Sequence, residues 1–483
     1  MRTVEISSGG AVLRALVPCA LLLTAVLSLA ALSGCGAAAV RAQRPPGASE
    51  PVVRVLLDGS ARETRLTSNV SLFARSLDFA EREFPNGVLV RSGASASGAR
   101  TLNLVDLLSG EVVDAGDEVA VHAAGDGILD CAGRPYRGAI VVRLTRGGAL
   151  QLVNALGMES YLLGVVAGEI GRLPLTRLEA VKAQAIAART YALSSIGQYG
   201  ASAGFDLYAT VQDQVYEGVR SEDPTADAAI HETSGQVLDY RGKLARAYYH
   251  ASCGGRTAPV DEVWTDISRT GYLRGTADRS MRLGGGYPLC GGGANFAWEE
   301  TWDGRTLERI LEKSLPRELG LPDGTDIGHV KGIKVLHRGV SGRVLDLEIT
   351  TTTDTYRVRS DKVRSVLRRP GPGDPVLRST LIRIEDVEKE AGRVSRLVVS
   401  GRGNGHGVGM CQLGAIGMAE AGASAREILA HYYPGARIRD LADVGGVPVP
   451  AATSLLAPPA AEIVERLIAW TGSPSSADPL ARR

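Results

Sequence analysis

A glutamate that continues an apolar helical stripe is the first residue suited to chemistry. Apolar residues recur at i, i+3, i+4, i+7 and i+8 from Met158 to Val166, and Glu169 takes the next position. A carboxylate on a buried stripe is partly removed from water, which raises its pKa. An acid that is still protonated near neutral pH can protonate a leaving group. The periodicity leaves a second interpretation open, in which Glu169 is an exposed residue at a helix end.

A glycine-rich loop surrounds a histidine near the C-terminal end of the chain. Six glycines lie between 401 and 414, and His406 stands among them. Such a loop lets the backbone approach a ligand closely, and a histidine can donate or accept a proton. No Lys-Ser pair of a phosphate-binding loop follows, which argues against phosphate binding. A flexible hinge with an incidental histidine is the competing interpretation.

A histidine and a cysteine three residues apart form the third candidate. His250 and Cys253 have the spacing of half a metal site or of a Cys–His pair. A disulfide between Cys253 and Cys290 that closes a loop is the favoured prediction. Cys131 and Cys411 also follow the leader described below, and no CxxC pair is present. One or two disulfides are therefore expected.

The elements around these residues indicate an α+β fold. Short alternating or apolar runs predict strands at 52–57, 87–91, 138–145 and 149–154. One helix should follow from 158, and a second should begin at Thr176, where Thr176 and Glu179 match a capping box. Lys182 and Arg189 are seven apart and so share one helix face. Less regular patterns predict strands at 237–240, 333–336, 345–350 and 394–400, and helices at 307–312 and 425–432.

The first 34 residues match a targeting segment. Arg2 and Arg14 precede the apolar run 15–32, which ends in Leu-Ser-Gly before Cys35. This resembles a bacterial lipoprotein signal, so we expect residues 1–34 to be removed and Cys35 to carry the lipid. An uncleaved membrane anchor is the alternative. Either way, the sequence predicts a cell-envelope protein that faces the periplasm or the exterior.

Composition sets further limits on the chain. Lys and Arg number 54 against 53 Asp and Glu, a net charge of +1, so no global basic field favours nucleic acid. Residues 35–50 are small, polar and proline-containing, as expected of a membrane tether. Residues 446–483 are rich in Ala and Pro and are predicted to be largely disordered.

Five segments of the chain carry long motifs in a fixed order. They are Tyr161–Glu169, Leu178–Tyr191, His250–Thr257, Gly403–Ala415 and His431–Gly435. Together they resemble one protein family, the stage II sporulation protein D family (SpoIID/LytB), and the resemblance covers roughly residues 50–440.

The resemblance implies a β-rich SpoIID-type domain at 136–440, in which a two-helix segment carries a catalytic glutamate. A smaller β-rich region at 51–135 would precede it. Active members are lytic transglycosylases, which cleave peptidoglycan glycan strands between MurNAc and GlcNAc and leave a 1,6-anhydro-MurNAc end. The sporulation branch prefers strands already stripped of stem peptides. The family's catalytic glutamate matches Glu169.

The resemblance also assigns supporting residues and partners. Glycan strands would be the substrate, with a cell-wall amidase as a further partner. Some relatives are described as non-catalytic amidase enhancers, which leaves a glycan-binding role open. The positions that would line the groove or support the glutamate are Lys182, Gln184, Arg189, His250, His406 and Gln412.

The sequence departs from the family pattern at two places. Some members carry a Cys/His zinc site after the second helix, but the corresponding positions here are Tyr208, Gln212 and Asp213. We therefore expect no zinc there and no cofactor. Cys411 stands where the family usually has serine, which places a thiol beside the expected groove. A metal-dependent hydrolase built on His250, Cys253 and His406 remains a third hypothesis.

Overall fold

The computed structural model describes residues 50–279, 286–322 and 324–445. The predicted signal peptide, the predicted lipidation residue Cys35, most of the predicted tether and the Pro/Ala-rich tail lie outside these ranges. Within them, no helix is both long enough and apolar enough to cross a membrane. The mixed α+β class is confirmed.

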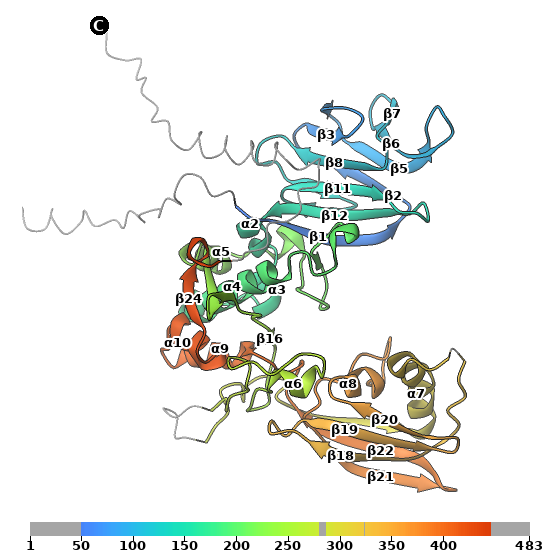
Figure 1. Ribbon diagram of the computed structural model, residues 1–483, viewed down its shortest axis with the longest axis vertical. Coiled ribbons are helices and arrows are strands. Elements are labelled where there is room, and N and C mark those ends of the chain that lie inside the picture. The colour runs from blue at the N-terminus through green and yellow to red at the C-terminus, as the bar shows by residue number, and fades with distance from the viewer. Residues whose placement is uncertain (1–49, 280–285, 323, 446–483) are drawn as a thin grey trace, which may run out of the picture. The chain divides into compact units, whose positions relative to one another are not determined.

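Two antiparallel-rich sheets share one core in the N-terminal half (Figure 1). Alternating side chains on both sheets point inward, as the buried positions of β3 show. The seven-stranded sheet has the order β13(Leu207–Tyr208), β1(Val52–Ala61), β12(Leu150–Gly157), β11(Ala139–Leu144), β8(Glu118–Ala123), β3(Leu72–Ser76), β4(Arg82–Phe84). The six-stranded sheet has the order β10(Arg134–Tyr136), β9(Leu129–Cys131), β2(Glu63–Thr67), β5(Val88–Ala94), β6(Arg100–Asp106), β7(Val112–Asp114).

The first sheet crosses the predicted domain boundary. β1 pairs along its length with β12, for example Val53 with Leu156. A boundary between residues 135 and 136 therefore runs through one sheet and one core, and the region 51–135 has no separate core of its own.

The helical segment after β12 places the glutamate. The predicted stripe is buried, but the chain forms two short helices, α2(Met158–Leu163) and α3(Val166–Ile170). A short 3-10 turn (Leu175–Arg177) leads into α4(Leu178–Ser195), a long and almost entirely buried helix. Further 3-10 turns lie at Ala201–Ala203, Gly218–Ser221 and Leu441–Asp443.

The predicted capping box at Thr176 is wrong. Because residues 175–177 wind as a 3-10 turn, α4 begins at Leu178 and Glu179 is only its second residue. Glu179 instead accepts a hydrogen bond from the backbone N–H of Ala425 at 2.7 Å. That amide opens α10(Ala425–Tyr432), whose own capping box is formed by Ser424 and Glu427.

A second core packs against one face of α4 and joins segments that are distant in sequence. β16(Tyr249–His250) pairs in parallel with β23(Met410–Cys411), so His250 lies opposite Cys411. Other elements of this region are α5(Pro224–Glu232), β14(Gln236–Tyr240), β15(Lys243–Leu244), α6(Val260–Val263), α9(Gln412–Glu420) and β24(Arg437–Asp440). In Figure 1 the green α4 and the red α9 and α10 belong to this group.

Residues 297–402 form an inserted unit with its own hydrophobic core. It contains two three-stranded sheets and a helix, α7(Gly304–Leu319), which is capped by Asp303 and buries one apolar face. The remaining elements are β17(Ala297–Asp303), β18(Val330–Arg338), β19(Val344–Thr351), β20(Thr355–Arg359), α8(Lys362–Val366), β21(Ile382–Glu390) and β22(Arg393–Arg402). The sequence predicted strands within β18, β19 and β22 and a helix within α7, whereas β17, β20, β21, α8 and the separate core were not predicted.

Candidate functional site

Glu169 lies in the last turn of α3 and is partly buried. Its Oε1 accepts a hydrogen bond from the backbone N–H of Val215 at 2.7 Å. The helix stops just beyond it because Gly171 adopts a positive φ of 87°, which few other residues tolerate. The side chain is therefore held against the 206–216 segment.

Burial raises the pKa of the Glu169 carboxyl from 4.5 to about 7. Hydrogen bonds from the Val215 amide and from the Gln412 and Tyr249 side chains lower the pKa and so limit the shift. Within the described ranges, no charged side chain contributes to it. Glu169 is thus an isolated acid that is about half protonated at neutral pH.

A chain of hydrogen bonds connects Glu169 to buried polar groups that sequence reasoning missed. The Tyr161 hydroxyl donates to Gln214 Oε1 at 2.9 Å, and Gln214 Nε2 donates to the Tyr249 hydroxyl at 2.8 Å. Tyr249 in turn hydrogen-bonds the Glu169 side chain. Burial holds the pKa of both tyrosines well above its usual value, so both remain neutral donors. Tyr161 belonged to the predicted stripe, but nothing in the pattern linked it to Gln214.

Asp213 fastens the loop that presents Gln214 and Val215. Its carboxylate accepts four hydrogen bonds, from the Tyr191 hydroxyl at 3.0 Å, Gln198 Nε2 at 3.0 Å, the Tyr199 hydroxyl at 2.8 Å and the Tyr208 amide at 2.9 Å. Residues 206–216 contain no Cys or His. They do not fit the zinc site that some family members carry here.

The fold brings Gln412 to Glu169 from a distant part of the chain, and Gln412 also meets Gln184. Gln412 is the first residue of α9, and its side chain hydrogen-bonds the glutamate. Its Nε2 also lies 3.5 Å from Oε1 of Gln184, which is fully buried in α4. The family resemblance assigned a supporting role to both residues, and that role stays a prediction.

Both ring nitrogens of His406 bond to backbone groups. Nε2 lies 2.9 Å from the Tyr249 carbonyl, and Nδ1 accepts from the Val408 amide at 3.1 Å. Burial lowers the pKa of His406 to about 4, so the ring is neutral with its proton on Nε2. His250 is also buried, and its Nδ1 bonds the Val408 carbonyl at 3.1 Å. The two rings fasten the glycine-rich loop, and contact with a substrate remains a prediction for both.

Lys182 and Arg189 make their ion pairs away from the glutamate. Lys182 Nζ lies 2.8 Å from Glu179 and 2.6 Å from Glu232. Arg189 is fully buried and binds both carboxylate oxygens of Glu159, at 2.8 and 2.6 Å. These contacts join α4 to its neighbouring helices.

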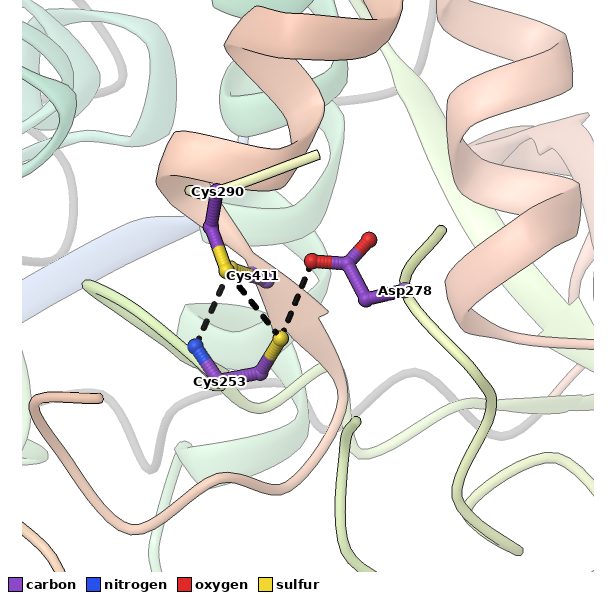
Figure 2. Close-up of side chains that lie close together, drawn as sticks. All are labelled: Cys253, Asp278, Cys290 and Cys411. Atoms are coloured by element: carbon purple, nitrogen blue, oxygen red, sulfur yellow. Dashed lines mark hydrogen bonds between the residues drawn. The ribbon is translucent and has the colours of Figure 1, made fainter. Parts of the chain in front are cut away.

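The expected disulfide between Cys253 and Cys290 is absent. Their Sγ atoms lie 3.6 Å apart, whereas a disulfide needs about 2.05 Å. The Cys253 thiol instead donates to Asp278 Oδ2 at 2.9 Å, and Cys411 joins the same group (Figure 2). Cys131 lies elsewhere, beside Thr64.

One group in the described part of the chain could hold a metal ion through three or more Cys, His, Asp or Glu side chains. It consists of Cys253, Asp278, Cys290 and Cys411. His250 and His406 are not among them, so the metal-dependent hydrolase hypothesis gains no support.

The buried acid makes stability depend on pH. The folded-state pKa of Glu169 lies above the unfolded value, so its stabilising contribution is complete below pH 4.5 and is lost as the pH rises through 7. The glutamine of Glu169→Gln stays neutral at every pH. The unfolding free energy of this variant relative to wild type should therefore increase by up to about 3 kcal/mol as the pH is raised from 4 to 8. Urea unfolding of wild type and variant at pH 4 and pH 8 measures this change. If the two proteins differed in unfolding free energy by the same amount at both pH values, the raised pKa would be contradicted.

Comparison with known proteins identifies the domain that carries this geometry. A family model described as stage II sporulation protein (SpoIID) matches residues 146–240, which include Glu169, α4 and Gln214. This part of the chain therefore resembles the SpoIID family. A second model, a domain of unknown function (DUF8618), matches residues 291–409 and so covers the inserted unit.

Several relatives extend the similarity over more than half the length of this chain. An uncharacterised protein of Brachyspira hyodysenteriae is 29% identical over 297 residues, covering 60% of this chain and 68% of the relative. The amidase enhancer of Bacillus subtilis is 30% identical over 288 residues, covering 53% of this chain and 37% of the relative. Stage II sporulation protein D of Bacillus amyloliquefaciens is 26% identical over 304 residues, covering 60% and 76%.

Proposed function

We propose that this protein is a lytic transglycosylase that cleaves peptidoglycan glycan strands, with Glu169 as its single acid and base. The observation that carries the proposal is the pKa of about 7 at an isolated, partly buried carboxyl group. The predicted leader and Cys35 would deliver the enzyme to the cell envelope as a lipoprotein.

One carboxyl group is sufficient for this reaction. Ordinary glycosidases use two, one as acid and one as base or nucleophile. In the proposed reaction, protonated Glu169 gives its proton to the glycosidic oxygen between MurNAc and GlcNAc as that bond breaks. The C6 hydroxyl of the same MurNAc attacks C1, and the Glu169 carboxylate takes the hydroxyl proton. The acid is thereby regenerated, and the product has a 1,6-anhydro end.

The neighbours of Glu169 suit both of its protonation states. Burial keeps the acid form available, while three donors, from Val215, Tyr249 and Gln412, stabilise the carboxylate after it has lost its proton. A pKa near the working pH serves both steps, since the group must first give and then take a proton.

A digest of purified peptidoglycan tests the proposal. Intact sacculi and sacculi stripped of stem peptides by an amidase would be incubated with the protein, and the products read by mass spectrometry. Anhydro-ended fragments support the transglycosylase. Fragments with reducing ends would show that water is the nucleophile, and the one-carboxylate mechanism would then be wrong.

A non-catalytic amidase-enhancing role is the second candidate. It rests on the 30% identity to a relative named amidase enhancer. In this case the digest yields no glycan fragments, but the protein binds strands and increases peptide release by a cell-wall amidase.

Activity should fall as the pH rises through about 7, because only protonated Glu169 can start the reaction. Tyr249→Phe removes a hydrogen bond that favours the carboxylate, so the pKa of Glu169 should increase and the alkaline limb should move to higher pH. Profiles of kcat/KM against pH for both proteins test this. Lower activity with an unmoved limb would mean that Tyr249 does not act on the carboxyl group.

A further inference from the structure

Three thiols and a carboxylate converge on one buried point outside the proposed catalytic site. They come from three separate segments. Cys253 follows β16, Asp278 and Cys290 belong to the irregular stretch before β17, and Cys411 ends β23. All four side chains are almost completely buried, and their ligand atoms lie within 4.8 Å of one another. Figure 2 shows the Cys253 and Cys290 sulfur atoms and an Asp278 oxygen facing a common centre.

We propose that Cys253, Asp278, Cys290 and Cys411 form a closed, four-coordinate structural site for zinc. With zinc–sulfur bonds of about 2.3 Å, two sulfur ligands of a tetrahedral ion lie about 3.8 Å apart. The Cys253 and Cys290 sulfur atoms are 3.6 Å apart, close to this spacing. The site lies away from the zinc position of other family members, which corresponds here to Tyr208, Gln212 and Asp213.

Neighbouring hydrogen-bond donors already orient the Asp278, Cys253 and Cys411 side chains. The Tyr432 hydroxyl donates to Asp278 Oδ1 at 2.7 Å, which leaves Oδ2 facing the thiols. Backbone amides point at two of the sulfurs. Gly255 N–H lies 3.3 Å from Cys253 Sγ, and the Cys253 and Gly414 amides lie 3.2 and 3.3 Å from Cys411 Sγ. Such outer partners hold metal ligands in place and support thiolates.

The charges of the group favour a cation. A carboxylate with no exposed surface is costly to bury unless it is paired with positive charge. The basic side chain beside Asp278 is His431, whose Nε2 lies 3.8 Å from Asp278 Oδ1. The buried guanidinium of Arg343 donates to the backbone carbonyl of Cys253 at 2.9 Å, which is not one of the four ligand atoms. A divalent ion would offset the charge of the carboxylate and of the thiolates directly.

The number of thiols argues against a simple disulfide. A bond between Cys253 and Cys290 would leave the Cys411 thiol and the Asp278 carboxylate buried beside it with no role. A single metal ion uses all four groups. It would also fix Cys411, and the next residue, Gln412, contacts Glu169. The site is independent of whether the protein cleaves glycan.

Metal analysis of the full-length chain tests the proposal. The protein would be purified without chelator, incubated with zinc under reducing conditions and then freed of unbound metal. We expect about one equivalent of zinc, lost in Cys290→Ser and Asp278→Asn and kept in Cys131→Ser, which changes a buried thiol outside the group. Tyr432→Phe keeps all four ligands and should weaken zinc binding about 10–100-fold in a chelator competition.

Cobalt provides a readout that does not depend on the variants folding. Co²⁺-loaded wild type should show sulfur-to-cobalt charge-transfer absorption and the visible bands of tetrahedral Co²⁺. Absence of bound metal in wild type, absence of the sulfur bands, or equal metal content in Cys290→Ser would overturn the proposal. So would a Cys253–Cys290 disulfide that persists in protein purified anaerobically.

Discussion

Glu169→Gln is expected to reduce the release of anhydro-ended fragments by about 10²–10⁴-fold, the usual contribution of a general acid. Glutamine keeps an oxygen that can accept from the Val215 amide, so the local structure should persist. What it lacks is the proton for the glycosidic oxygen. The measurement is the rate of fragment release from amidase-stripped sacculi, with strand binding followed in parallel.

Glu217→Gln is the matched control. Glu217 is exposed and lies two residues beyond Val215. The substitution Glu217→Gln therefore makes the same chemical change outside the site. We expect wild-type rates from it. If Glu169→Gln kept full activity, the proposed acid would be wrong. If neither wild type nor variant released fragments but both bound strands and stimulated an amidase, the enhancer role would stand.

Arg189→Met should lower the free energy of unfolding by about 3 kcal/mol, the lower end of the range for breaking a buried ion pair. The Arg189 side chain is 1% exposed, and its partner Glu159 is 30% exposed. Methionine fills similar volume but removes the guanidinium that donates to Glu159 and to the Gln236 carbonyl. Urea unfolding at neutral pH measures the change.

Lys182→Met serves as the comparison from the same helix face. Its partners Glu179 and Glu232 are 38% and 49% exposed, so the loss should stay below about 1 kcal/mol. If Arg189→Met unfolded like wild type but raised KM for glycan strands, Arg189 would be a substrate-binding residue, as the family resemblance implied. A large loss of stability with an unchanged KM would make it a structural residue.

Much of the fold followed from local patterns. The alternating runs gave the positions of β1, β5, β11 and β12, and the helical stripe gave the buried face that leads to Glu169. Pairing between distant strands could not be predicted, because an alternating pattern identifies a strand but does not indicate which other strand it pairs with. For that reason the sharing of one sheet by β1 and β12 was missed. The break between α2 and α3 was missed because apolar spacing continues through it.

Part of the predicted set of site residues is brought together by the fold. Glu169 contacts Gln412, which in turn contacts Gln184, and the roles that the motifs assign to them stay predictions. Tyr161, Gln214 and Tyr249 were missed because their roles depend on one hydrogen-bond chain across three segments. The cysteines were misread for a similar reason. Spacing suggested a pair, whereas the fold adds Asp278 and Cys411, and no sequence pattern links an aspartate to a cysteine more than a hundred residues away.

The parallel pairing of β16 with β23 has a consequence for how the molecule is made. Synthesis proceeds from the N-terminus, so Glu169 emerges long before Gln412 and the strand that delivers it. Contacts across such separations form late, because the chain between them must first be ordered. A nascent or prematurely terminated chain therefore carries the acid without one of its three donors. Any reaction that needs the complete set is withheld until translation has passed residue 412.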